Sequence, residues 1–78
     1  MISGEQLRQL RSLHIIVQKA FAKKLHITQQ AYSKMERRKL INGERLVQIM
    51  EALGYTKEEF EKIIKNLPPP ENELAISS

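Results

Sequence analysis

The sequence predicts an all-α domain of five helices, and three observations lead to that prediction. Apolar residues recur at intervals of three and four in most segments, as in the series from Leu46 to Leu53. Residues that favour helix starts and stops, such as Asn42 and Gly54, lie at the ends of this series. No segment alternates apolar and polar residues in the manner of a strand.

The first three predicted helices are short and closely spaced. The first covers about residues 3–14, with Ser3 as its N-cap. The second covers about residues 18–25, and the third covers residues 28–37 behind the capping hydroxyl of Thr28. The residues expected to form the apolar stripes of the first two helices are Leu7, Leu10, Leu13, Ala20, Phe21 and Leu25.

A fourth helix is expected over residues 43–53, with Asn42 as its cap and Gly54 just past its end. In the connection before it, we expect Leu40 and Ile41 to be tucked into the core.

The fifth helix begins after Thr56, which can form a capping box with Glu59. Three prolines stop this helix after Leu67, because proline cannot continue a helix. We therefore expect one domain over residues 1–67 and a flexible C-terminal tail over residues 68–78.

The composition limits the class of protein. A chain of 78 residues has room for one domain, and without cysteine its stability must come from helix packing. The absence of cysteine fits a reducing cytosol. No apolar run approaches the roughly eighteen residues of a membrane span, and the N-terminus turns polar too early for a signal peptide. We expect a cytoplasmic protein with no membrane partner.

Charge is distributed unevenly along the chain. Residues 1–50 contain ten Lys or Arg and three Glu, a net charge of +7, whereas residues 51–78 contain three Lys and six Glu, a net charge of −3. No acidic residue lies between Gln6 and Met35. This distribution suits a polyanionic partner. The alternative is a solvated surface that is rich in lysine.

The outward side of the predicted third helix carries amides and cations but no acid. At 100° per residue, Ala31, Tyr32 and Met35 fall on the side that we expect to face the core. Glu36 falls between the two sides. The opposite side carries Gln29, Gln30, Ser33, Lys34 and Arg37.

Two glutamines in the first turn of a helix suit contact with DNA bases. A glutamine side chain can make two hydrogen bonds to the N6/N7 edge of adenine, and the N-terminal residues of a recognition helix reach the base edges. We therefore expect Gln29 and Gln30 to read bases, with Lys34 and Ser33 beside them. A plain solvent-exposed face is the alternative.

The basic run at the end of this helix favours phosphate contact. Arg37, Arg38 and Lys39 continue from the helix into the next connection, so they can follow a nucleic-acid backbone. Thr28, at the start of the helix, is also expected to contact a phosphate.

The chain between the second and third helices is very short. Only His26 and Ile27 separate Leu25 from the Thr28 cap. A turn of this length forces the two helices to cross near a right angle, which is the helix-turn-helix geometry.

Residues 3–55 resemble the helix-turn-helix domain of the phage-repressor and Cro family, the Xre-type or lambda-repressor-like regulators. The resemblance covers about two-thirds of the chain and implies a lambda-repressor-like bundle that binds DNA. The matching residues are GEQLRQLR (4–11), Gln18, FAKKL (21–25), TQQAYSKMER (28–37) and RLVQIMEALGY (45–55).

The resemblance also implies roles for individual residues. In that family the residue matching Gln18 contacts a phosphate at a helix N-terminus, and those matching the two glutamines and Lys34 read bases. The residues matching Arg11 and Glu36 form a partly buried ion pair that ties the first helix to the end of the third.

The chain departs from the family pattern at four positions. The family usually has glycine where this chain has Ile15, His26 and Arg38, and a Ser or Thr cap where it has Val17. His26 is therefore expected in a left-handed conformation, which histidine tolerates better than most residues. Without a capping side chain, the second helix should start more weakly, by roughly 1 kcal/mol.

The predicted function is sequence-specific binding of double-stranded DNA by a small transcriptional regulator. One such domain buries too little surface for tight specific binding, so we expect a homodimer on a palindromic operator. An enzyme is not expected, because the chain has no Asp, Cys or Trp and no Gly-rich phosphate loop. We expect no cofactor, metal or small-molecule ligand, and structural roles for His14 and His26.

Two alternatives remain at this point. The bundle could be a protein-interaction module, either antitoxin-like or an adaptor, whose basic face meets an acidic protein. The same cations could instead bind RNA. Salt dependence of duplex binding and competition by structured RNA separate these possibilities.

Overall fold

The computed structural model describes residues 2–68, and within them it contains five helices and no strand. The helices are α1 (Gly4–Leu13), α2 (Gln18–Lys24), α3 (Gln29–Glu36), α4 (Gly43–Leu53) and α5 (Lys57–Lys65). The prediction of an all-α bundle of five helices is confirmed. Of the expected tail, residues 68–78, all but Pro68 lies outside the described residues.

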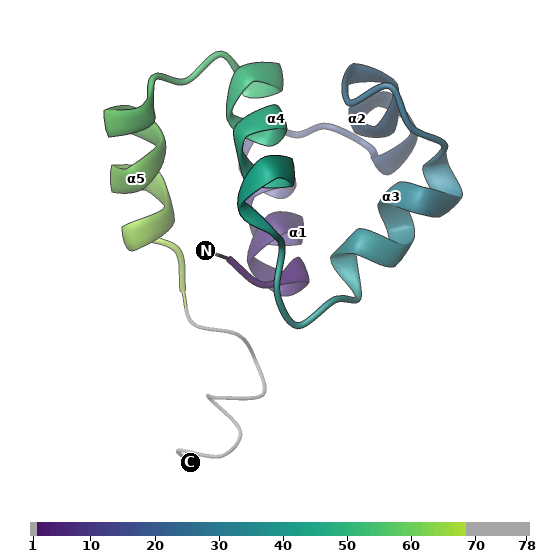
Figure 1. The fold of residues 1–78 in the computed structure, drawn as a ribbon, viewed down its shortest axis with the longest axis horizontal. Coiled ribbons are helices and arrows are strands. Elements are labelled where there is room, and N and C mark those ends of the chain that lie inside the picture. The colour runs from purple at the N-terminus through teal and green to yellow at the C-terminus, as the bar shows by residue number, and fades with distance from the viewer. Residues whose placement is uncertain (1, 69–78) are drawn as a thin grey trace.

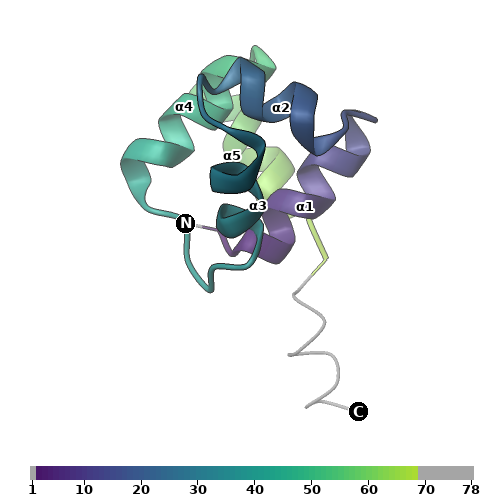
Figure 2. The same ribbon diagram turned by 90° about the vertical axis from the view of Figure 1, so that its right-hand side faces the viewer.

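The helices form a bundle in which α1 and α4 lie between the other elements. Figure 1 shows α2 and α3 at one end of the bundle and α5 at the opposite end. α3 packs closely against both α2 and α1, and Figure 2 shows it at the front of the molecule. The outer side of α3 is therefore not covered by any other helix of the described chain.

Four of the five helices start with a side-chain cap. Ser3 and Thr56 form capping boxes at the starts of α1 and α5, and Thr28 and Asn42 cap α3 and α4. Val17, at the start of α2, makes no side-chain cap, as the sequence predicts.

The core is a single cluster to which every helix contributes. Tyr32 is fully buried, with its ring centroid 5.3 Å from that of Phe21. Tyr32 is therefore a core residue, and its ring is not accessible for stacking on a DNA base. The buried residues are Ile2, Leu7, Leu10, Phe21, Ala22, Leu25, Tyr32, Met35, Ile41, Ile49 and Phe60.

Two residues expected in the core are exposed instead. The prediction for Leu13 is wrong because α1 ends there and the chain turns away at His14, which leaves the side chain 66% exposed. The prediction for Leu40 is wrong because its neighbour occupies the core position. Ile41 donates its backbone N–H to the carbonyl of Ile2 at 2.8 Å and is buried, whereas Leu40 is 58% exposed.

Two alanines expected on apolar stripes are also exposed. Ala20 and Ala31 lie beside the buried residues of α2 and α3 rather than among them. Each helix is short and buries only two residues, so its apolar stripe is narrower than the sequence suggests.

Within residues 2–68, two non-glycine residues have a left-handed backbone. His26 has φ 59°, as expected for the turn between α2 and α3, and Ile15 has φ 52°. This conformation costs roughly 1–2 kcal/mol for an ordinary residue. Ile15 is 91% exposed, so burial of its side chain does not offset that cost.

The start of α1 lies directly against the end of α3. The backbone N–H of Gly4 donates to the carbonyl of Arg38 at 2.8 Å. A Cβ at position 4 would lie 2.5 Å from the backbone carbonyl of Glu36. Only glycine therefore allows this approach, which fixes where α3 ends relative to α1.

Replacement of Gly4 by alanine should lower the free energy of unfolding by about 1–3 kcal/mol, because backbone atoms must move to admit the methyl group. Chemical denaturation measures the change. The matched control is Gly43→Ala, since a Cβ there meets nothing within 4 Å. Its stability should be unchanged or slightly higher. Equal stability of the two variants would contradict the close contact.

Candidate nucleic-acid interface

The turn between α2 and α3 sets the position of the candidate reading helix. Ile27 donates its backbone N–H to the carbonyl of Ala22 at 3.0 Å, which closes the end of α2. The Thr28 hydroxyl oxygen then accepts from the backbone N–H of Ala31 at 3.1 Å, which caps α3. The turn and the start of α3 are therefore held by the chain's own hydrogen bonds.

The outer side of α3 presents polar side chains to solvent. Gln29, Gln30 and Lys34 are exposed, and Ser33 is half-buried between them and the core. Among residues 2–68, none of these four side chains makes a hydrogen bond to the protein. Their donors and acceptors are available to a ligand.

Cations continue past the end of α3. Arg37, Arg38 and Lys39 are all exposed and follow the helix without a break. No acidic residue lies in the sequence between Gln6 and Met35. A polyanion approaching α3 therefore meets amides first and positive charge beside them.

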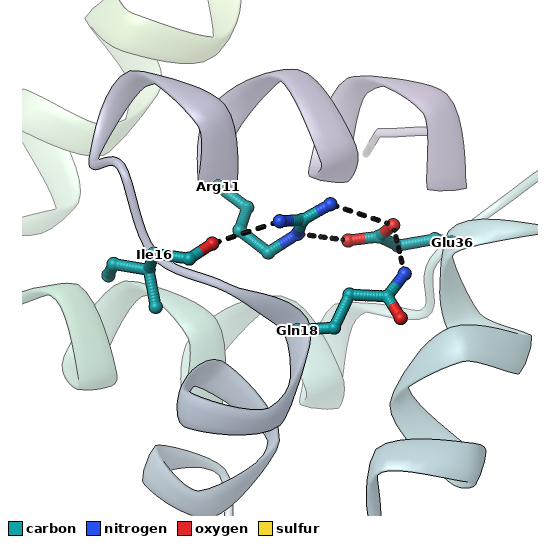
Figure 3. Close-up of polar contacts among 4 residues, drawn as sticks. All are labelled: Arg11, Ile16, Gln18 and Glu36. Atoms are coloured by element: carbon teal, nitrogen blue, oxygen red, sulfur yellow. Dashed lines mark hydrogen bonds and ion pairs between the residues drawn. The ribbon is translucent and has the colours of Figure 1, made fainter.

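Arg11 and Glu36, which the family resemblance implies as an ion pair, are in contact in the structure. Arg11 Nε lies 2.7 Å from Glu36 Oε2, and the two side chains are 17% and 5% exposed. Arg11 Nη2 lies 3.4 Å from Glu36 Oε1. Arg11 also donates through Nη1 to the carbonyl of Ile16 at 2.9 Å, as Figure 3 shows. Arg11 thus joins the α1–α2 connection to the end of α3.

Gln18 makes a hydrogen bond inside the protein that the sequence did not predict. Its Nε2 donates to Glu36 Oε1 at 2.9 Å, so one of its amide hydrogens is used inside the protein (Figure 3). The second amide hydrogen and the carbonyl oxygen make no hydrogen bond among the described residues. Nothing in the sequence signals this contact, because residues 18 and 36 lie on different helices.

The network determines the protonation state of Glu36. Burial alone would raise the pKa of the Glu36 carboxyl, but hydrogen bonds from Arg11 and Gln18 outweigh it and hold that pKa below its ordinary value. The hydrogen bond to Glu36 raises the pKa of Arg11. Burial, and then the neighbouring Glu36 carboxylate, raise the pKa of the Tyr32 phenol. Among residues 2–68, the Tyr32 hydroxyl has no hydrogen-bond partner.

Residues 2–68 contain no group of three potential metal ligands close together. No helix among them is long and apolar enough to cross a bilayer.

Acid should destabilise the protein through Glu36. Its pKa is lower in the folded state than the ordinary 4.5, so its contribution is complete above pH 4.5 and is lost as pH falls through the folded-state pKa. Glu36→Gln should cost on the order of 3 kcal/mol at neutral pH, because it leaves Arg11 without its counter-charge. It should also flatten the loss of stability below about pH 4.5.

Denaturation midpoints from about pH 7 down to pH 2.5 test this. Glu59→Gln is the control, because Glu59 also has a lowered pKa but lies exposed at a capping box. That variant should keep most of the acid sensitivity. Parallel pH profiles for wild type and Glu36→Gln would contradict the assignment.

Comparison with known proteins places the chain in a family. A family model described as helix-turn-helix matches residues 7–60, which is more than half of the chain. No curated protein and no solved structure gives a significant match. The matched region begins in α1, ends in α5 and contains the α2–turn–α3 unit. The chain belongs to the helix-turn-helix family of the phage-repressor and Cro (Xre) type, a family of DNA-binding domains.

Proposed function

We propose that this protein is a small transcriptional regulator that binds double-stranded DNA sequence-specifically, with α3 in the major groove. The observation that carries this proposal is the outer side of α3, where Gln29 and Gln30 are exposed in the first turn and Lys34 is exposed one turn later. A helix with these side chains fits the groove and can bond to base edges.

The first turn of α3 supplies the base contacts in this proposal. Gln29 and Gln30 each have a donor and an acceptor on one planar group, which matches adenine. Lys34 can donate to guanine O6 or N7, and Ser33 can donate or accept beside it. The hydrogen bonds that close the turn before α3 support such readout, because they hold the reading residues in place before DNA arrives.

Exposed cations and two polar side chains at helix N-termini supply the phosphate contacts in this proposal. Arg37, Arg38 and Lys39 are exposed just past α3 and would bind the backbone on one side of the groove. Thr28 can donate its hydroxyl hydrogen, since only its oxygen is used in the cap. Gln18 can donate its second amide hydrogen to a phosphate while the first remains on Glu36.

Two copies are expected on one operator. A single domain of this size buries too little surface on DNA for tight and specific binding. Two copies related by a two-fold axis would read two half-sites about one helical turn apart, and the operator would be a palindrome.

Gln29→Ala and Gln30→Ala should each weaken binding to a selected operator by about 1–3 kcal/mol and relax the preference at one base pair. Fluorescence anisotropy against the operator and single-base variants measures both effects. The salt dependence should stay as in wild type, because no phosphate contact is lost.

Two controls accompany this test. Gln48→Ala replaces an exposed glutamine on α4 and should bind as wild type does. Lys39→Ala should weaken all duplexes alike and reduce the log–log salt slope by about 1. The base-reading assignment is wrong if both α3 variants bind and discriminate like the parent. Equal competition by structured RNA would contradict the choice of duplex DNA.

A further inference from the structure

An apolar groove of about 680 Å³ lies between α1 and α5. Leu13 lines it from α1, and Ile63 and Leu67 line it at and just beyond the end of α5. Leu13 is 66% exposed, and the other two side chains are half-buried, so the groove is open to solvent. The groove therefore holds apolar side chains that the described part of the chain leaves uncovered.

A polar atom without a partner lies beside these apolar side chains. Gln9 lines the groove, and its Oε1 atom is buried with no hydrogen-bond partner among residues 2–68. A buried acceptor is costly until a donor reaches it. Because Gln9 is only half-buried as a whole, rotation of its amide would bring this oxygen to the groove. A peptide segment suits such a groove, since it supplies apolar side chains and backbone N–H donors together.

The chain itself leaves the described residues at this groove. Pro68 is the last described residue, and it lines the groove. Figure 2 shows the chain leaving α5 beside α1. Ten residues follow in the sequence, PPENELAISS (the 69–78 segment). Because this segment is attached at the edge of the groove, its effective concentration there is far above that of a separate partner.

The 69–78 segment contains an apolar run that can reach the groove. Leu74, Ala75 and Ile76 are consecutive in the sequence. The six residues from Pro68 to Leu74 span at most about 20 Å when extended, and they include Asn72, a residue type that favours turns. The chain can therefore reverse direction and bring the apolar run back to the groove.

Charge favours the same contact. The 69–78 segment has two glutamates and no cation, whereas residues 2–68 contain thirteen Lys or Arg and seven Glu, a net charge of +6. Arg8 is exposed at the border of the groove. Its Nη2 pairs with Glu5 Oε1 at 2.6 Å, which leaves other guanidinium N–H groups for a second carboxylate. The body thus attracts the segment, and Arg8 offers it a specific partner.

We propose that the α1–α5 groove binds the 69–78 segment of the same chain, with Leu74 and Ile76 against Leu13 and a segment glutamate at Arg8. The segment is then ordered by docking, in place of the free tail expected from the sequence. The docked segment joins the end of α1 to the end of α5. This contact is independent of DNA recognition, because α2 and α3 lie at the opposite end of the bundle from α5 (Figure 1).

A spin label on the full chain tests the contact. The chain has no cysteine, so Ser77→Cys provides one site for a nitroxide. Amide signals of Ser12 and Leu13 should lose most of their intensity relative to the same sample with the label reduced. In the labelled chain that also carries Leu74→Ser/Ile76→Ser, these signals should recover, because the apolar run no longer holds the segment in the groove.

Stability gives a second measurement. Leu74→Ser/Ile76→Ser in the full chain should raise the equilibrium constant for unfolding by about tenfold, because these side chains lose their apolar contacts. Leu13→Ser should destabilise the wild-type chain but have little further effect after the segment pair is replaced, since the two sites act through one contact. Leu40→Ser is the matched control. Leu40 is also an exposed aliphatic residue but lies outside the groove, so its effect should be equal in both backgrounds.

Three results would overturn the proposal. The first is equal signal loss in the labelled chain with and without Leu74→Ser/Ile76→Ser, which a freely moving segment would give. The second is full additivity of the Leu13 and segment substitutions. The third is signal loss at Leu13 in an isotope-labelled chain mixed with a separate spin-labelled chain, because the groove would then bind the segment of a second copy. None of these results bears on DNA binding, which selection from random duplexes measures separately.

Discussion

The arrangement of the first three helices depends on the hydrogen bonds that the buried Glu36 carboxylate accepts. This carboxylate lies at the end of α3 and accepts hydrogen bonds from Arg11 of α1 and Gln18 of α2. Its side chain is 5% exposed, so the charge is stable there only while both donors stay in place. The close approach of Gly4 to the Glu36 carbonyl reinforces the same junction. The buried Glu36 carboxylate and the missing Cβ at Gly4 thus hold the end of α3 against α1 and α2.

The two sides of α3 carry different kinds of side chain. Tyr32 and Met35 face inward and anchor α3 in the core, while Gln29 and Gln30 face solvent with their amides unpaired among the described residues. Because the anchoring residues and Glu36 hold α3 from behind, the outer side needs no contact with the rest of the protein. In the proposed function, the backbone of α3 is already fixed before binding, so the ordering cost falls mainly on the exposed side chains. The exposed cations after α3 add positive charge beside it without occupying the face itself.

Much of the fold could be predicted from local patterns. Spacing of apolar residues and caps such as Asn42 located the helices within two residues, and the helical wheel placed Gln29 and Gln30 outside and Tyr32 inside. The errors at Ala20 and Ala31 arose because the short helices α2 and α3 bury only two residues each. The other two arose where the direction of the chain, rather than the helical period, decides burial. Leu13 and Leu40 lie at a helix end and in a connection, and both are exposed. The bond between Gln18 and Glu36 could not be predicted from the residues, because two helices must first be packed before their side chains can meet.

Selection from a pool of random duplexes tests the central claim, that the outer side of α3 reads DNA, most directly. The account predicts enrichment of an inverted repeat whose half-sites are spaced about one helical turn apart. It also predicts that a Gln29→Ala/Gln30→Ala double variant selects a repeat with the same spacing but with less sequence information at two positions in each half-site. A pool that shows no enrichment with the wild-type protein, or the same sequence from both proteins, would contradict it.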